Sequence, residues 1–190
     1  GDDGGRRLDR GRTDLDIARI CVAKLHCARA GVNKERIYNY FGDKRQLFTH
    51  VLREELAKVA QAVPVHSFAP EDIGAWAGRV YDYHCVHPEL NRLMRWEGLY
   101  FDAEVPDEEL RSTYYNQKIQ AIHAGQAAGT LATTIDADHL AFLILSIAGW
   151  WSAVPQVARM FTGPETDAEH ARRRESVITA AQLLAGTYNQ

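Results

Sequence analysis

Hydrophobic side chains recur along most of the chain at the three- and four-residue spacing of an amphipathic helix, and no stretch alternates convincingly with period two. From Asp43 the chain reads Asp-Lys-Arg-Gln, a start that resembles a capping box. Pro64 ends this first long pattern. Its apolar positions are Phe48, Leu52, Leu56, Val59 and Val63. The pattern therefore predicts a helix over residues 43–63 in an all-α protein.

Proline and acidic residues mark the starts of further helices. Pro70, Pro88 and Pro106 each come before or within an acidic first turn, where proline and negative charge favour a helix. Asp136 precedes a long apolar run, and Thr166 with Glu169 forms a second capping box. These boundaries predict helices over residues 70–87, 88–101, 106–129, 136–154 and 166–186. About five long helices would then form the body of the protein.

The run from Leu140 to Val154 is apolar nearly all round. It is shorter than the roughly 18 residues that span a bilayer, so we expect a soluble protein with no membrane partner. A helix of this kind must be covered on both sides. It is either the central helix of the body or a dimer helix, since its small residues permit close approach. They are Ser146, Ala148, Gly149, Ser152 and Ala153. We favour a homodimer through helices near 140–154 and 169–186.

Charge is distributed unevenly along the 190 residues. Residues 1–50 contain 11 Lys and Arg against 7 Asp and Glu, whereas residues 51–190 contain 11 against 18. A basic segment on an acidic body indicates a nucleic-acid-binding module joined to another domain, with a chance imbalance as the alternative. The three cysteines form no paired framework, and no secretory signal opens the sequence, so we expect a cytoplasmic protein.

The stretch from Ala28 to Lys44 has the pattern helix, turn, short helix, turn, long helix. Gly31 can end the first helix in the left-handed conformation, Asn33 can cap the next, and Gly42 can end it. The exposed face of the short helix would carry Lys34, Arg36, Tyr38, Asn39 and Tyr40. Cationic and hydrogen-bonding groups of this kind suit a helix in the major groove of DNA. A solvated helix in an unrelated helical protein is the alternative.

Residues 26–52 resemble the TetR family of transcriptional regulators. The family signature is Ala-Gly-Val-Ser, then Leu/Ile-Tyr-x-Tyr/His-Phe, then Lys-x-x-Leu. The chain supplies Ala30-Gly31-Val32-Asn33, Ile37-Tyr38-Asn39-Tyr40-Phe41, and Lys44 followed by Leu47-Phe48. The resemblance implies that Tyr38, Tyr40 and Lys44 hold phosphates. It also implies that Lys34, Arg36 and Asn39 lie nearest the bases, where sequence preference is set.

The resemblance also implies the domain organisation. Residues 13–50 would form a helix-turn-helix DNA-binding domain, and residues 51–190 a helical effector-binding and dimerisation domain. The first helix is atypical, because residues 13–30 predict one continuous helix where the family has two. Residues 1–12 combine glycines and charges with a single aliphatic residue, which predicts a disordered arm.

As a member of this family, the chain would be a ligand-responsive regulator, a repressor that a small molecule releases from a palindromic DNA operator. Two DNA-binding heads must meet major grooves about 34 Å apart, so a pivot of the helix over residues 43–63 would weaken binding. Aromatic and soft side chains are candidates for the effector pocket, with ordinary core as the alternative. They are Trp76, Tyr83, Met94, Trp96, Tyr100, Tyr114, Phe142 and Trp150.

Other chemistry has little support in the sequence. No nucleophile elbow, phosphate-binding glycine loop or metalloprotease helix is present, so we expect no enzyme and no cofactor. Cys21 and Cys27 flank His26 without regular ligand spacing. His84 and His87, which flank Cys85, precede Pro88 at a helix end, where histidine is already favourable through the helix dipole, so we expect no metal. The alternative function is an all-helical interaction protein without specific DNA binding.

Overall fold

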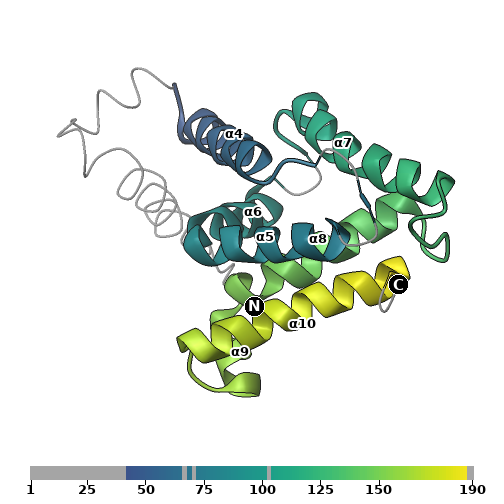
Figure 1. Ribbon diagram of the computed structural model, residues 1–190. Helices are drawn as coiled ribbons and strands as arrows, with labels where there is room; N and C mark the ends of the chain where they lie inside the picture. Colours follow the sequence, from purple (N-terminus) through teal and green to yellow (C-terminus); the bar gives the residue numbers. More distant parts are fainter. Residues whose placement is uncertain (1–41, 66–67, 70–71, 102–103, 188–190) are drawn as a thin grey trace, which may run out of the picture. The chain divides into compact units, whose positions relative to one another are not determined.

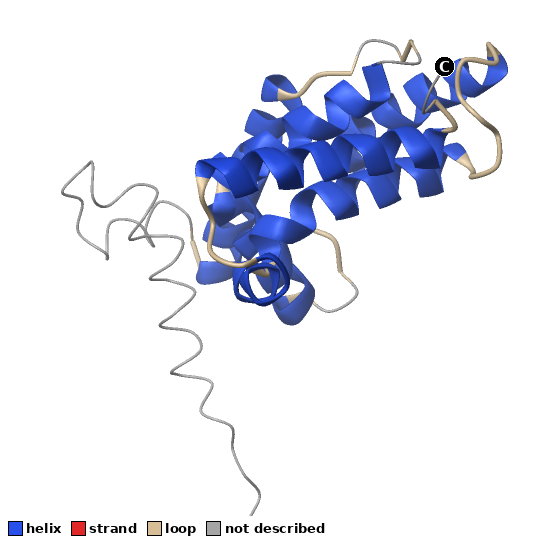
Figure 2. Cartoon of the chain, turned by 60° about the horizontal axis from the view of Figure 1, so that its bottom comes forward, coloured by secondary structure: helices blue, strands red, loops and turns tan. Residues whose placement is uncertain are grey.

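The computed structural model describes residues 42–65, 68–69, 72–101 and 104–187. Across these residues the chain forms α-helices and no strand, as Figures 1 and 2 show, and the all-α prediction is confirmed. The chain divides into two compact units between Glu54 and Glu55, inside the first described helix. The helices are α4 (Lys44–Ala62), α5 (Asp72–Val86), α6 (Pro88–Tyr100), α7 (Glu108–Ala127), α8 (Ala137–Ala153), α9 (Pro155–Thr162) and α10 (Asp167–Ala185).

Two of the predicted helix caps form as expected. Asp43 Oδ1 accepts a hydrogen bond from the backbone N–H of Gln46 at 2.8 Å, and Thr166 Oγ1 accepts one from Glu169 at 3.2 Å. Each bond satisfies a backbone donor that the first turn of a helix leaves free. The predicted cap at Asp136 is only half right: this residue occupies the N-cap position of α8, but its side chain makes no capping hydrogen bond.

The short helix α9 was not predicted. Its eight residues follow directly on α8, and Pro155 occupies its first turn, where a missing N–H costs nothing. Gly163 ends it with a φ of 83°, in the left-handed region that suits glycine. No single described helix has the length and apolarity to cross a bilayer, although α8 and α9 together reach them across a bend of 87°.

In the part of α4 that belongs to the N-terminal unit, Leu47, Phe48, Val51 and Leu52 are buried. Phe48 and Leu52 were two of the predicted apolar positions. Just before α4, Gly42 has a φ of 82°, the backbone conformation expected of a glycine that ends a helix.

The C-terminal unit is built around α8, which packs against α5, α6, α7, α9 and α10. Helices α5 and α10 also pack on each other, and their backbones approach closely because two glycines of α5 face α10. A Cβ atom on Gly74 would lie 2.9 Å from Gln182, and one on Gly78 would lie 3.0 Å from Arg174 and 3.1 Å from Ile178. A larger side chain at either position would require Gln182, or Arg174 and Ile178, to shift.

The long apolar helix α8 is covered mainly by its own chain. Its inner face is fully buried at Leu140, Ile144 and Ala148. Among its small residues, Ala148 and Gly149 are buried within the chain's own fold, and a Cβ on Gly149 would lie 3.5 Å from His84 of α5, whereas Ser146 is exposed. Pairing of α8 with a second copy stays a prediction. The outer face still exposes large apolar side chains, with 72% of Phe142 accessible to solvent.

The loop between α7 and α8 is fastened to the end of α10. The N–H of Ala132 donates to the carbonyl of Ala185 at 2.8 Å. Gly186 has a φ of 69° and lies so close to the loop that a Cβ atom on it would meet Ala132 Cβ at 2.6 Å. Gln126, in the last turn of α7, donates to the carbonyls of Ala132 and Ile135 at 2.9 and 2.7 Å. The C-terminal end of α7 is thus held in place.

Candidate functional site

The predicted DNA contacts fall almost entirely outside the described residues. Lys44 is the first residue of α4, directly after Asp43, and its side chain is not described. The other five contacts stay predictions from the sequence. They are Lys34, Arg36, Tyr38, Asn39 and Tyr40.

A cavity of about 600 Å³ lies inside the C-terminal unit, among α4, α5, α6, α7 and α8. Pockets for small molecules are typically roughly 300 to 1,000 Å³, so this one has room for a medium-sized organic compound. Each of the five helices contributes aliphatic side chains to the wall. Among them are Leu56, Val59, Val63, Val80, Leu90, Ile119 and Leu145.

One end of the wall is polar and buried. His84 is only 6% exposed, and burial, followed by the nearby His87, lowers its pKa to about 4, so the ring is neutral at physiological pH. Its Nδ1 atom is buried and has no hydrogen-bond partner among the residues described. Asn91 Nδ2 donates to the carbonyl of Gly149 at 3.1 Å and also contacts Ser152 Oγ. An unsatisfied buried nitrogen is costly, and it is the kind of group a ligand can satisfy.

Basic side chains form another part of the wall. Arg111 is neutralised by Glu97, with Nη2 3.0 Å from Oε2 and a second contact between Nη1 and Oε1. Lys118 is not neutralised: Nζ donates to the carbonyl of Tyr114 at 3.1 Å, and no carboxylate of the described chain lies within 4 Å of it. Burial lowers the pKa of Lys118. A hydrogen-bond acceptor placed beside Lys118 would therefore be favourable.

The structure gathers half of the predicted pocket residues at this cavity. Met94, Tyr114, Phe142 and Trp150 lie in its wall, and their contact with a ligand stays a prediction.

The other predicted pocket residues are placed elsewhere. Trp76 is fully buried in the core, where its ring packs edge-on against Phe68 at 5.4 Å. Tyr83 packs on His87, with ring centroids 4.4 Å apart. Trp96 is half-buried outside the wall, and the side chain of Tyr100 is not described. The aromatic residues that were predicted to line a pocket therefore divide between the wall of the cavity and the hydrophobic core.

Polar wall residues were missed by the sequence analysis, although a pattern that marks them is present. Lys118 lies four residues after Tyr114 and four before the fully buried Ile122, so it occupies the inner stripe of α7. His84 follows Val80 by four residues on the inner stripe of α5 in the same way. A polar side chain on an apolar stripe is the feature that could have identified both.

Comparison with known proteins places this arrangement in a class. Residues 72–182, more than half of the chain, match the family described as "Tetracyclin repressor-like, C-terminal domain". The chain belongs to the TetR family of transcriptional regulators, which are ligand-responsive DNA-binding proteins, as the resemblance over residues 26–52 indicated.

Individual relatives agree with this assignment. Over 158 residues the chain is 41% identical to the HTH-type transcriptional repressor SCO4008 of Streptomyces coelicolor, an alignment that covers 83% of this chain and 80% of that protein. The crystal structure of SCO4942 from Streptomyces coelicolor has the same fold, with a TM-score of 0.69 at 23% identity, over 92% of this chain and 97% of the other.

Proposed function

We propose that the chain represses transcription from a palindromic operator and that a medium-sized, largely apolar molecule in the cavity releases it from DNA. The observation that carries this proposal is the 600 Å³ cavity with α4 in its wall. Helix α4 contributes Leu56, Val59 and Ala60 to that wall, and it begins at Lys44, directly after the segment that resembles a DNA-binding helix. Along the chain, α4 thus follows the segment that resembles a DNA-binding helix and then contributes to the wall of the cavity.

Release follows from differential binding. A ligand shifts an equilibrium only by its difference in affinity for the two states. Contacts with Leu56, Val59 and Ala60 would differ between two positions of α4, because these side chains move with the helix. In a dimer, the two DNA-binding domains must meet major grooves about 34 Å apart. A small rotation of α4 would change the distance between these domains and so weaken binding to DNA.

The wall also suggests what kind of molecule enters. Aliphatic side chains predominate, and Tyr114, Phe142 and Trp150 add aromatic rings that can stack on a planar group. Lys118 and the neutral His84 offer polar contacts. We infer a partly aromatic effector with at least one hydrogen-bond acceptor, which would lie beside Lys118.

The residues that would contact DNA follow from the family resemblance. We infer that Tyr38, Tyr40 and Lys44 bind phosphates and that Lys34, Arg36 and Asn39 approach the base edges. Substitution of a phosphate-binding residue should weaken binding to all sequences alike, whereas Arg36→Ala should mainly relax sequence preference.

We further infer a homodimer that covers the outer face of α8 and the exposed side of α10. Phe142, Leu143 and Trp150 of α8 are 72%, 39% and 61% exposed, and Leu183 of α10 is 59% exposed. Apolar side chains of this size on neighbouring helices are typical of an interaction surface. Phe142 and Trp150 also belong to the cavity wall, so a second copy seated here would cover part of the cavity's mouth.

The test begins with selection of bound duplexes from random DNA by the purified protein, with its mass in solution measured by light scattering. We expect an enriched palindrome and a mass twice that of one chain. Compounds that raise the melting temperature of the protein should then reduce its affinity for the selected duplex, measured by fluorescence anisotropy. Featureless enrichment of DNA would contradict the proposal.

A pair of variants on α6 tests whether the cavity is the effector site. Met94→Trp fills part of the cavity, whereas Arg92→Trp adds the same side chain at an exposed position of α6 outside the wall. We expect Met94→Trp to weaken effector binding at least tenfold without loss of DNA binding, and Arg92→Trp to change neither. Equal effector affinity in the two variants would place the effector elsewhere.

A further inference from the structure

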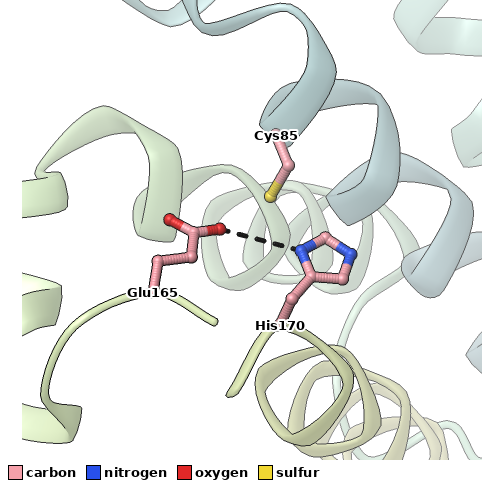
Figure 3. Close-up of side chains that lie close together, drawn as sticks. All are labelled: Cys85, Glu165 and His170. Atoms are coloured by element: carbon pink, nitrogen blue, oxygen red, sulfur yellow. Dashed lines mark ion pairs between the residues drawn. The ribbon is translucent and has the colours of Figure 1, made fainter. Parts of the chain in front are cut away.

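A second group of chemically reactive side chains lies outside the cavity, where the end of α5 meets the start of α10. Figure 3 shows Cys85 from α5, Glu165 from the loop before α10 and His170 from the first turn of α10 pointing toward one another. Their thiol, carboxylate and imidazole donor atoms all lie within 4.8 Å of one another. None of the three lines the effector cavity.

The two nitrogens of the imidazole ring lie near different carboxylates, at ion-pair rather than hydrogen-bond distances. Nδ1 of His170 lies 3.7 Å from Glu165 Oε1, and Nε2 lies 3.6 Å from Asp82 Oδ1. Asp82 is itself fixed by Arg174, whose Nε lies 3.0 and 2.8 Å from the two carboxylate oxygens. Histidines that bind metals almost always direct the second ring nitrogen to a carboxylate, carbonyl or water. The ring is therefore already oriented as a metal ligand would be.

Neighbouring side chains support this orientation from other directions. The ring of Tyr81 packs on that of His170 with centroids 5.1 Å apart, and its hydroxyl lies 3.5 Å from the backbone carbonyl of His170.

The only cation near Glu165 among the described ion pairs, apart from the histidine, is Arg173 at 3.7 Å. Arg173 has a nearer partner in Glu169 at 3.1 Å, so the carboxylate of Glu165 remains available.

The thiol of Cys85 is neutral in the absence of a metal. Burial raises its pKa, hydrogen bonding with Tyr81 lowers it, the carboxylates Glu165 and Asp82 raise it, and Arg173 lowers it, with a net rise. A divalent cation reverses this balance, because its positive charge stabilises the thiolate, which is the form that binds metal.

We propose that Cys85, Glu165 and His170 bind a Zn²⁺ ion, with Asp82 positioning the histidine. One thiolate, one imidazole and one carboxylate are donors that zinc accepts, and three protein ligands leave a fourth position for water. Cys85 would release its proton to solvent as the metal–sulfur bond forms. Glu165 is exposed and lies in a loop, so it is the ligand with room to move toward the ion.

A second group of potential ligands serves as a contrast. Asp136, Asp138 and His139 also lie close together, but all three are exposed and none is a thiol. Exposed acidic groups of this kind are common without a metal. Of these two groups in the described part of the chain, only the one at Cys85 combines a half-buried thiol with a histidine that lies beside a second carboxylate.

Bound zinc would connect two elements of the C-terminal unit. It would join the last turn of α5 to the first turn of α10, and Cys85 is the immediate neighbour of His84 in the effector cavity. The ion would therefore hold in place the turn that carries the buried imidazole. This makes zinc a second input beside the effector, and the metal site stands whether or not the cavity binds a ligand.

The experiment is a titration of the reduced, metal-free full chain with Zn²⁺ alone, in competition with a chromogenic chelator. Cys21, Cys27 and His26 lie outside the described residues, so the titration uses a Cys21→Ser/Cys27→Ser background. We expect one Zn²⁺ per chain. Cys85→Ser and His170→Gln should each weaken binding at least tenfold, and Asp82→Asn about tenfold, the usual loss for a residue that supports a metal ligand. His139→Gln, on the exposed group, should have no effect.

Cobalt provides an independent readout. Co²⁺ bound at this site should show thiolate-to-metal charge-transfer absorption, and Cys85→Ser should abolish it while far-ultraviolet circular dichroism confirms the fold. If the double background variant does not fold, wild type should bind one Zn²⁺ more per chain than Cys85→Ser. Unchanged stoichiometry and affinity in Cys85→Ser, or no zinc binding by the background variant, would overturn the proposal.

Discussion

The C-terminal unit has a tight side and a loose side. On the tight side, α5 and α10 meet through Gly74 and Gly78, with charged groups paired across the contact as Asp82 and Arg174. On the loose side, α4, α6 and α7 enclose a cavity of about 600 Å³ with α5 and α8. The loose side also holds two buried nitrogens without a partner in the described chain, His84 Nδ1 and Arg111 Nε. Helices α5 and α8 belong to both sides, because each packs against α10 and also lines the cavity.

The difference indicates which part of the unit responds to a ligand. The cavity opens to solvent where Phe142 and Trp150 line it, so part of its apolar wall stays in contact with water. A ligand that enters removes that apolar surface from water, whereas the contact between α5 and α10 has no such surface to cover. Movement should therefore involve α4, α6 and α7, with α5, α8 and α10 as the fixed base.

The largest expected effect tests the tight side. In Gly78→Leu the new side chain would meet Arg174 and Ile178 from 3.0 Å outward, so we expect the free energy of unfolding to fall by about 2 to 3 kcal/mol through overpacking. Urea denaturation followed by circular dichroism measures it. The matched control is Gly98→Leu on α6, where a Cβ meets nothing within 4 Å. That variant should gain up to about 1 kcal/mol from helix propensity. Equal losses would remove the distinction between the two sides.

A smaller effect of opposite sign is expected on the loose side. Ala141 is 5% exposed and lines the cavity, so the added carbons of Ala141→Leu enter empty space. We expect the free energy of unfolding to rise by about 1 kcal/mol, since each buried methylene contributes about 0.8 kcal/mol and part of the gain is lost to rotamer entropy. Effector affinity should fall at the same time. A loss of 2 kcal/mol or more, of the size expected for overpacking, would show that the wall is already rigid.

The smallest effect concerns the basic wall. Burial lowers the pKa of Lys118 in the folded chain, so between that lowered value and the ordinary value of about 10.4 the unfolded chain binds more protons. Wild-type stability should therefore rise with pH through that window. Lys118→Met should be more stable than wild type at neutral pH by under about 1 kcal/mol, because solvent screens a partly exposed ammonium. The two proteins should converge as the pH approaches 10.4 in urea titrations. A pH-independent difference would assign the effect to packing.

Local chemistry was predicted well from the sequence, and packing between helices was not. Asp43 and Thr166 cap their helices because a side-chain oxygen and a backbone N–H three residues later are set by local geometry alone. Helix α9 was missed although Pro155 at its start and the apolar spacing of Val157, Met160 and Phe161 indicate a short amphipathic helix. Composition alone did not show which of the small residues of α8 face the chain's own core, as Ala148 and Gly149 do, and which face outward, as Ser146 does.

The cavity could be predicted only in part. Met94 and Tyr114 were candidates because soft and aromatic side chains suit a pocket, yet Trp76 belongs to the same class and lies in solid core. A void arises from how five helices fit together, and no single stretch of sequence encodes that fit. Lys118 and His84 are more informative, since a polar group on an apolar stripe conflicts with local pattern, and such conflicts occur where function requires them.

The contact between Ala132 and Ala185 determines how α7 can move. The C-terminal end of α7 is fixed near Gln126, beside α10, so the helix can rotate about that end. Its N-terminal half, which carries Arg111, would then move furthest. A displacement along the wall would thus grow toward the end where Arg111 grips Glu97 of α6. A ligand that displaces α7 would therefore change the distance between Arg111 and Glu97 more than any contact near Gln126.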